Sequence, residues 1–155
     1  MLSFNTYFHY TITAYGKEIE PGVPSIADSI QTLIELSAQV GKERIAWRYY
    51  PVLLTEKYTI QKHLQTFEEM AGAIAPYIDR CIFSFVEMYK KLEKNMPELI
   101  PLTVQDKETL AEGFGAIAKK YGIYLQTCGT NGDYTHYGIH KSGCMTLCII
   151  LNPLF

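Results

Sequence analysis

Three polar side chains that could carry chemistry stand at the ends of apolar runs: Arg48, Glu87 and Cys128. An arginine presents a planar fork of N–H donors that matches a carboxylate or a phosphate. A glutamate can act as a general base or a metal ligand, and a cysteine as a nucleophile or a soft metal ligand. We therefore take these three as candidate catalytic residues, and a small anionic molecule as the candidate ligand.

Each of the three also has a purely structural interpretation. Arg48 could form an ion pair with Glu87 at the end of the next strand, because structural ion pairs gather charges just as catalytic sites do. Glu87 could be a solvated residue at the start of a short helix, and Cys128 a buried structural cysteine. The sequence leaves these alternatives open.

Other patterns that would carry chemistry are weak or missing. The sequence contains neither G-x-G-x-x-G nor G-x-x-x-x-G-K-[ST], and no serine nucleophile elbow, so no motif supports nucleotide binding or serine catalysis. Cys144 and Cys148 lie four positions apart and lack the paired C-x-x-C units of a zinc site. The four histidines are scattered, and His136 and His140 are interpreted as surface loop residues.

The composition is that of a folded chain, and it argues against several classes of partner. Hydrophobic residues make up 48%, charged residues 19%, and the net charge is −2. The chain can therefore build a core, and it offers no basic block to a nucleic acid. It lacks a signal-peptide pattern and any apolar run long enough to cross a membrane. We expect a cytoplasmic protein with reduced cysteines and with no membrane or nucleic-acid partner.

Short apolar runs rich in β-branched and aromatic residues predict four strands. They lie at residues 7–14, 44–49, 81–86 and 123–127, and Pro51 is expected to end the second of them.

Three longer segments between these strands repeat apolar residues at helical spacing. Each is preceded by a residue that can cap a helix: Ser25, Thr59 and Thr103. Gly41 and Gly122 follow the first and third segments, where a left-handed backbone is needed. Residues 90–95 are expected to be partly helical.

Alternating strands and helices imply parallel strands joined by helical crossovers. Two architectures fit, an open doubly wound sheet and a stretch of (β/α) barrel. A closed barrel of eight units needs about 250 residues, so 155 residues cannot close one. We expect an α/β fold, a partial (β/α) barrel of four parallel strands and three main helices, over residues 1–144. Residues 145–155 form an atypical apolar tail.

Several segments, in the same order, resemble the bacterial domain of unknown function 1848 family. They are residues 8–16 with 19–21, 41–49, 81–89, 126–128, and 137–139 with 143–144. The resemblance implies a (β/α) barrel of about twice this length, with further N-terminal strands. It also implies a C-terminal cysteine cluster similar to the iron–sulfur ligands of radical S-adenosylmethionine enzymes. Cys128 and Cys144 match family cysteines, but this chain has neither the earlier strands nor the terminal cluster.

The chain departs from that family pattern at two places. After Trp-Arg-Tyr the family has Asp-Pro, whereas this chain has Tyr50 and Pro51, so a carboxylate that could pair with Arg48 is missing. After Cys144 the family continues with polar, helical sequence, whereas residues 145–155 are apolar. The second departure suggests a frameshifted or truncated reading frame.

Three functions stay open at this point. The first is a piece of a barrel enzyme, dependent on a metal or an iron–sulfur cluster in its full-length relatives, with Arg48 orienting an anionic substrate and Cys128 near the chemistry. The second is a non-catalytic remnant that self-associates through its open strand edges. The third is a small α/β binding domain whose helices cover both faces of the sheet.

Overall fold

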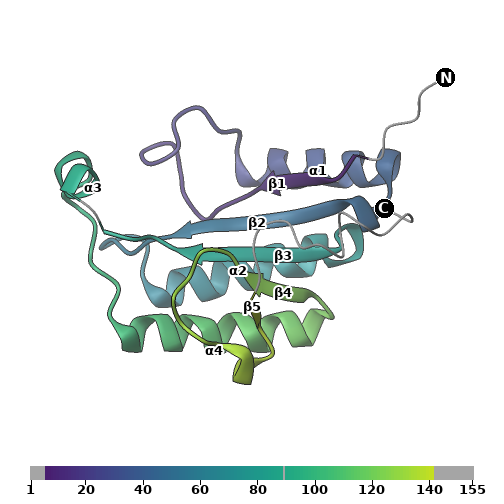
Figure 1. The fold of residues 1–155 in the computed structure, drawn as a ribbon. Coiled ribbons are helices and arrows are strands. Elements are labelled where there is room, and N and C mark those ends of the chain that lie inside the picture. The colour runs from purple at the N-terminus through teal and green to yellow at the C-terminus, as the bar shows by residue number, and fades with distance from the viewer. Residues whose placement is uncertain (1–5, 89, 142–155) are drawn as a thin grey trace.

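The computed structural model describes residues 6–88 and 90–141, which form an α/β fold (Figure 1). The strands are β1 (Phe8–Thr11), β2 (Ile45–Val52), β3 (Arg80–Phe85), β4 (Tyr124–Thr127) and β5 (His140–Lys141). The helices are α1 (Ile26–Val40), α2 (Ile60–Ile74), α3 (Lys90–Asn95) and α4 (Val104–Tyr121), with short 3-10 turns η1 (Lys42–Arg44), η2 (Ala75–Tyr77) and η3 (Thr135–Tyr137). No described helix is both long and apolar enough to cross a membrane.

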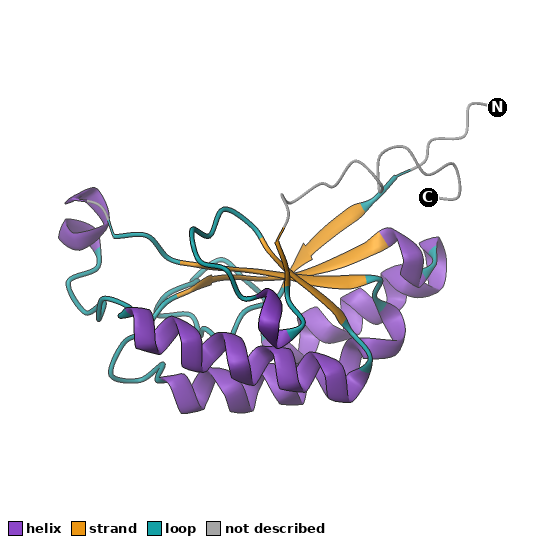
Figure 2. Ribbon diagram, turned by 60° about the horizontal axis from the view of Figure 1, so that its bottom comes forward, coloured by secondary structure: helices purple, strands orange, loops and turns teal. Residues whose placement is uncertain are grey.

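All five strands are parallel and lie in chain order, β1-β2-β3-β4-β5, which confirms the predicted alternation. The long helices α1, α2 and α4 lie on one side of the sheet (Figure 2). Right-handed crossovers explain this, because a chain that adds every new strand at the same edge places every helix on the same face. The described sheet is open, with β1 and β5 at its edges, and it has none of the strand reversal that a doubly wound sheet requires.

The prediction of four strands is wrong by one, because β5 was missed. Two residues, one of them a lysine, give no β-branched or aromatic run to recognise. The position of β5 depends on η3 instead, where the Tyr137 hydroxyl donates to Glu108 Oε2 of α4 at 2.8 Å. Gly115 of α4 permits this approach, since a Cβ there would lie 2.4 Å from the Tyr137 carbonyl oxygen. The domain boundary expected after residue 144 lies outside the described residues.

The predicted end of the second strand at Pro51 is also wrong, because β2 continues to Val52. The pairing of β2 with β3 shifts register between Tyr49 and Val52, and the exposed Pro51 lies in that irregularity. A proline cannot donate to a strand ladder, so a bulge is where a strand tolerates one. Conversely β1 is shorter than expected and covers only Phe8–Thr11.

The predicted helix starts are confirmed. The side chains of Ser25, Thr59 and Thr103 each accept a hydrogen bond from the backbone N–H three residues further on. Gly122 ends α4 in the left-handed conformation, with φ 68° and ψ 30°. Gly41 ends α1 with φ 92° and ψ 142°, a positive-φ conformation that favours glycine but is not the left-handed helical one expected.

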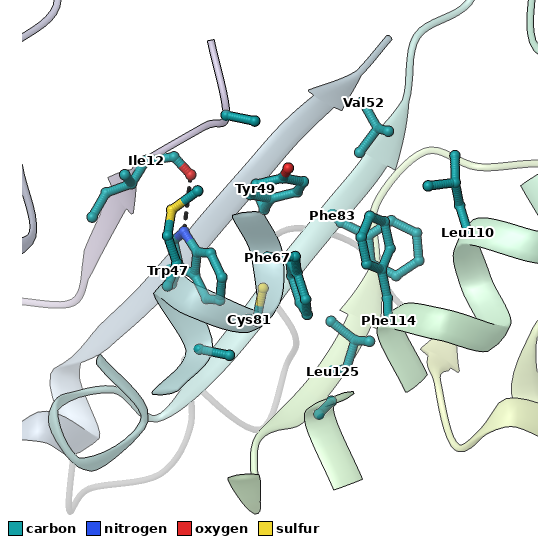
Figure 3. Close-up of a cluster of buried hydrophobic side chains, with 14 of the residues drawn as sticks. Ile12, Trp47, Tyr49, Val52, Phe67, Cys81, Phe83, Leu110, Phe114 and Leu125 are labelled. Atoms are coloured by element: carbon teal, nitrogen blue, oxygen red, sulfur yellow. Dashed lines mark hydrogen bonds between the residues drawn. The ribbon is translucent and has the colours of Figure 1, made fainter. Parts of the chain in front are cut away.

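An aromatic core fills the space between the sheet and the helices (Figure 3). Trp47 of β2 stacks on Phe67 of α2 with ring centroids 4.9 Å apart, and Phe67 lies 4.4 Å from Phe114 of α4. Phe83 of β3 meets the same Phe114 ring at 5.3 Å. The Trp47 Nε1–H donates to the carbonyl oxygen of Ile12 at 3.0 Å, so the only polar atom of this side chain is satisfied. Alternate residues of each strand must therefore point away from the helices.

Candidate functional site

The residues that point away from the helices form two rows across the sheet, which we call the helix-free face. Partnered residues of a parallel ladder point to the same side, so the register of the strands gives each row. The first row is His9, Ala46, Arg80 and Tyr124, and the second is Thr11, Arg48, Ile82, Gln126 and His140. A sheet face that packs against helices or another sheet is apolar. These two rows are mostly polar and carry two guanidinium groups.

Arg48 lies in the middle of β2 rather than at its end, because the strand continues beyond Pro51. Its guanidinium lies over the ring of Tyr50, with Cζ 4.1 Å from the ring centroid, and Nη2 donates to the Tyr50 hydroxyl. The Arg48 Nε atom is buried and has no hydrogen-bond partner within residues 6–88 and 90–141. Among the described residues no carboxylate forms an ion pair with Arg48. Its positive charge is therefore stacked on an aromatic ring, and no acid of the described residues neutralises it.

Arg80, the second guanidinium of the face, is paired with an acid and packed on an aromatic ring. Its Nε donates to Asp79 at 2.7 Å and its Nη1 to Gln126 Oε1 at 3.1 Å, while Cζ lies 4.8 Å from the Tyr124 ring centroid. The Tyr7 hydroxyl donates to the same Asp79 carboxylate at 2.9 Å. Burial, with the nearby Asp79 charge, raises the pKa of Tyr7, so its hydroxyl stays a donor. We interpret this cluster as structural.

His9 of β1 is the second group with an unsatisfied atom on this face. Its Nε2 atom is buried and has no hydrogen-bond partner in the part of the chain that the structure describes. Burial lowers the pKa of His9, and the positive charges of Arg48 and Arg80 lower it further. The ring meets Tyr7 edge to face at 5.7 Å. A neutral imidazole thus lies within the influence of two cations, and no acid contributes to its titration.

The structure does not bring Glu87 to Arg48. Glu87 is exposed in the segment that follows β3, and no ion pair joins the two side chains within the described part of the chain. The structural ion pair that the sequence allowed is therefore not formed. The solvated interpretation of Glu87 fits its position.

The expectation that Cys128 is a reduced thiol is wrong for this structure, where Cys128 is disulfide-bonded. Its backbone N–H donates to the Phe83 carbonyl oxygen at 3.1 Å and so extends the pairing of β3 with β4. A disulfide sulfur is neither a nucleophilic thiolate nor a ready metal ligand. Cys81 is a free thiol, but it is buried on the helix side of β3, where burial raises its pKa.

The described residues do not fit a resident metal or iron–sulfur cluster. Such clusters need several cysteine thiolates that point at one place. Cys81 is buried on the helix side of β3 and Cys128 is disulfide-bonded, while Cys144 and Cys148 lie outside the described residues. No group of three or more His, Cys, Asp and Glu side chains within 6–88 and 90–141 could hold a metal ion.

A cavity of about 600 Å³ lies elsewhere, among the loops at the carboxyl ends of the strands. Neither Arg48, Glu87 nor Cys128 lines it; its walls are Glu18, Ile19, Thr55, Glu56, Lys57, Tyr58, Pro97, Glu98, Leu99 and Ile100. Hydrogen bonds from Lys57 and Tyr58 lower the pKa of Glu18 to about 2. Because that carboxylate is already satisfied by protein donors, we interpret this network as one that fixes the loops.

His63 is a buried histidine that no sequence motif singled out. Its Nε2 lies 2.7 Å from the Leu53 carbonyl oxygen, an acceptor only, so this nitrogen must carry the proton. Nδ1 then accepts from the Tyr49 hydroxyl at 2.8 Å. Both ring nitrogens are satisfied, and burial lowers the pKa of His63 below 6.5. The residue ties the loop after β2 to α2 and is structural.

His63 predicts a pH dependence of stability. In the unfolded chain His63 takes up a proton near its ordinary pKa of 6.5, whereas burial in the folded chain lowers that pKa. The contribution of the neutral His63 to the free energy of unfolding is fully present above pH 6.5. It is lost as the pH falls toward the lowered pKa of the folded state. We expect the free energy of unfolding, measured by urea titration, to fall as the solution is acidified through this range. His63→Gln should make that slope shallower, and an unchanged slope would contradict the assignment.

Comparison with known proteins gives one match. A protein-family model described as "Domain of unknown function (DUF1848)" matches residues 1–153, nearly the whole chain. No curated protein and no solved structure matches. The match agrees with the resemblance found in the sequence, and it brings no named activity with it.

Proposed function

This chain belongs to the DUF1848 family, and from that premise we propose that its helix-free face binds a small anionic ligand through Arg48. The observation that carries the proposal is the buried Arg48 Nε, for which the described residues provide no hydrogen-bond partner. Buried polar atoms are paired in most proteins, and an unpaired one needs an explanation. An anion bound beside the guanidinium would supply the missing acceptor.

The surroundings of Arg48 support the same proposal. Tyr50 stacks on the guanidinium without neutralising it, at the position where the family resemblance led us to expect an aspartate. His140 lies in the same row and offers a further polar side chain. A charged hydrogen bond is worth about 1.5–3 kcal/mol, enough for a measurable affinity when several act together.

We further propose that the sheet is part of the wall of a (β/α) barrel. Strands in chain order with all long helices on one face are the arrangement of that fold. The inner positions of a barrel are usually filled by Val, Ile and Leu, whereas this face carries arginines, histidines and a glutamine. Such residues suit a chamber that holds a polar ligand. In an enzyme Arg48 would orient the anionic part of the substrate.

Tyr50→Asp tests this proposal by supplying a competing anion. The new carboxylate lies on β2 two residues after Arg48, on the same face, and can form an ion pair with it. We expect the affinity of this variant for sulfate, measured by isothermal titration calorimetry, to be lower by about tenfold or more. Tyr50→Phe is the matched control, since it keeps the ring and adds no charge. If both variants bind sulfate as the wild type does, Arg48 is not the anchor.

A further inference from the structure

We propose that His9 is a second ligand-binding residue of the same site, and that the site takes a dianionic tetrahedral oxyanion such as a phosphate group. This inference rests on the proposed function of Arg48. Across the described residues, the buried side-chain atoms without a hydrogen-bond partner are His9 Nε2, Arg48 Nε and Thr130 Oγ1. The first two come from neighbouring strands of one face.

The register of the sheet places His9 and Arg48 close together. His9 is paired with Ala46, and Arg48 is the next residue of β2 on the same face. The positive charge of Arg48 acts on the His9 imidazole, which agrees with this closeness. Adjacent parallel strands lie about 4.8 Å apart, so one small oxyanion can reach donors on both. A tetrahedral group offers oxygens in several directions, which suits donors that come from two strands better than a planar carboxylate does.

The charges near His9 favour a dianion. Arg80 also acts on His9, but its charge is offset by the paired Asp79. Tyr7 lies two residues before His9, just ahead of β1, and its ring meets the imidazole as a neutral group. Arg48 contributes one positive charge without a carboxylate partner, and a protonated His9 would contribute a second. Among the described residues, no carboxylate acts on His9 to offset either charge. Two cations match an anion of charge −2, whereas a monocarboxylate leaves one cation uncompensated.

A proton should therefore enter with the ligand. Without an anion, burial and the two guanidinium groups hold His9 neutral, so the pKa of its imidazole is low. A bound dianion reverses that electrostatic preference and favours the imidazolium, whose Nε2–H then donates to the ligand. Binding is linked to proton uptake, and the affinity must rise as the pH falls, by up to about tenfold per pH unit for one proton.

The experiment is isothermal titration of the full chain with sulfate, which keeps its charge of −2 over the range used. We expect binding about tenfold tighter at about pH 5.5 than at about pH 7.5, with proton uptake revealed by buffers of different ionisation enthalpy. His9→Gln keeps a donor that does not titrate, so its affinity should no longer depend on pH. Inorganic phosphate and glycerol phosphate distinguish a free ion from a phosphomonoester, and acetate tests the preference for charge −2.

The outcomes separate this inference from the proposed function. No sulfate binding at either pH would overturn both. Sulfate binding that needs Arg48 but shows no proton uptake, and is unchanged in His9→Gln, would overturn the role of His9 alone. Acetate bound as tightly as sulfate would overturn the dianion. The pH dependence of the wild type decides the case even if the variant folds poorly.

Discussion

Arg48→Met is expected to weaken sulfate binding by about tenfold to a hundredfold while leaving the chain as stable as the wild type or more so. The methionine keeps an apolar stem of similar length but removes the guanidinium, and with it a charged hydrogen bond worth about 1.5–3 kcal/mol, or about tenfold to a hundredfold in affinity. The same change removes a charge that no described carboxylate pairs with. The free energy of unfolding should therefore stay level or rise by about 1–3 kcal/mol.

The combination of lost binding and retained stability is what distinguishes a ligand-binding arginine from a structural one. Lys91→Met is the matched control, because it removes the same charge from an exposed side chain on α3. The Lys91→Met control should bind sulfate with the same affinity as the wild type and unfold with the same free energy in urea. A marked loss of stability in Arg48→Met, with sulfate affinity intact, would assign Arg48 a structural role.

Phe67→Ala should strongly destabilise the aromatic core. Phe67 is fully buried and lies between the Trp47 and Phe114 rings, so it joins the sheet to both α2 and α4. Truncating a buried phenylalanine costs about 3–5 kcal/mol through lost transfer energy and the cavity left behind. Urea unfolding followed by circular dichroism measures the loss.

The exposed Val104 provides the control for that experiment. Its side chain is 80% exposed at the start of α4, so Val104→Ala should change the free energy of unfolding by less than about 0.5 kcal/mol. A loss below about 1 kcal/mol for Phe67→Ala would mean that the helices do not pack on the sheet around this ring.

The helices were predictable because their signals are local. Ser25, Thr59 and Thr103 occupy the cap positions expected of them, and Gly122 ends α4 as predicted. Caps and apolar periodicity act within a few residues and need no tertiary contact. The parallel arrangement followed from the alternation of strands and helices.

The strand details were less predictable because contacts far along the chain decide them. β5 has two residues and is placed by η3 and α4, not by its own β propensity. Pro51 was expected to end β2, yet a register shift against β3 lets the strand continue. Neither effect can be found within a short window of sequence.

The candidate site was predictable only in part. Arg48 was found from its position in an apolar run, but its pairing with Tyr50 and its unpaired Nε depend on which face of the strand it occupies. Strict alternation in β1 and β2 was the signal that could have linked His9 to Arg48, because the two lie on the same face. Self-association through the strand edges and a cytoplasmic location stay predictions.

Selenate, an anomalously scattering analogue of sulfate, tests the central claim most directly. Diffraction from crystals of the full chain soaked with selenate should give an anomalous peak within hydrogen-bonding distance of both Arg48 Nε and His9 Nε2. Peaks confined to other parts of the surface, with Arg48 Nε bonded to an acceptor from the protein itself, would contradict an anion-binding face.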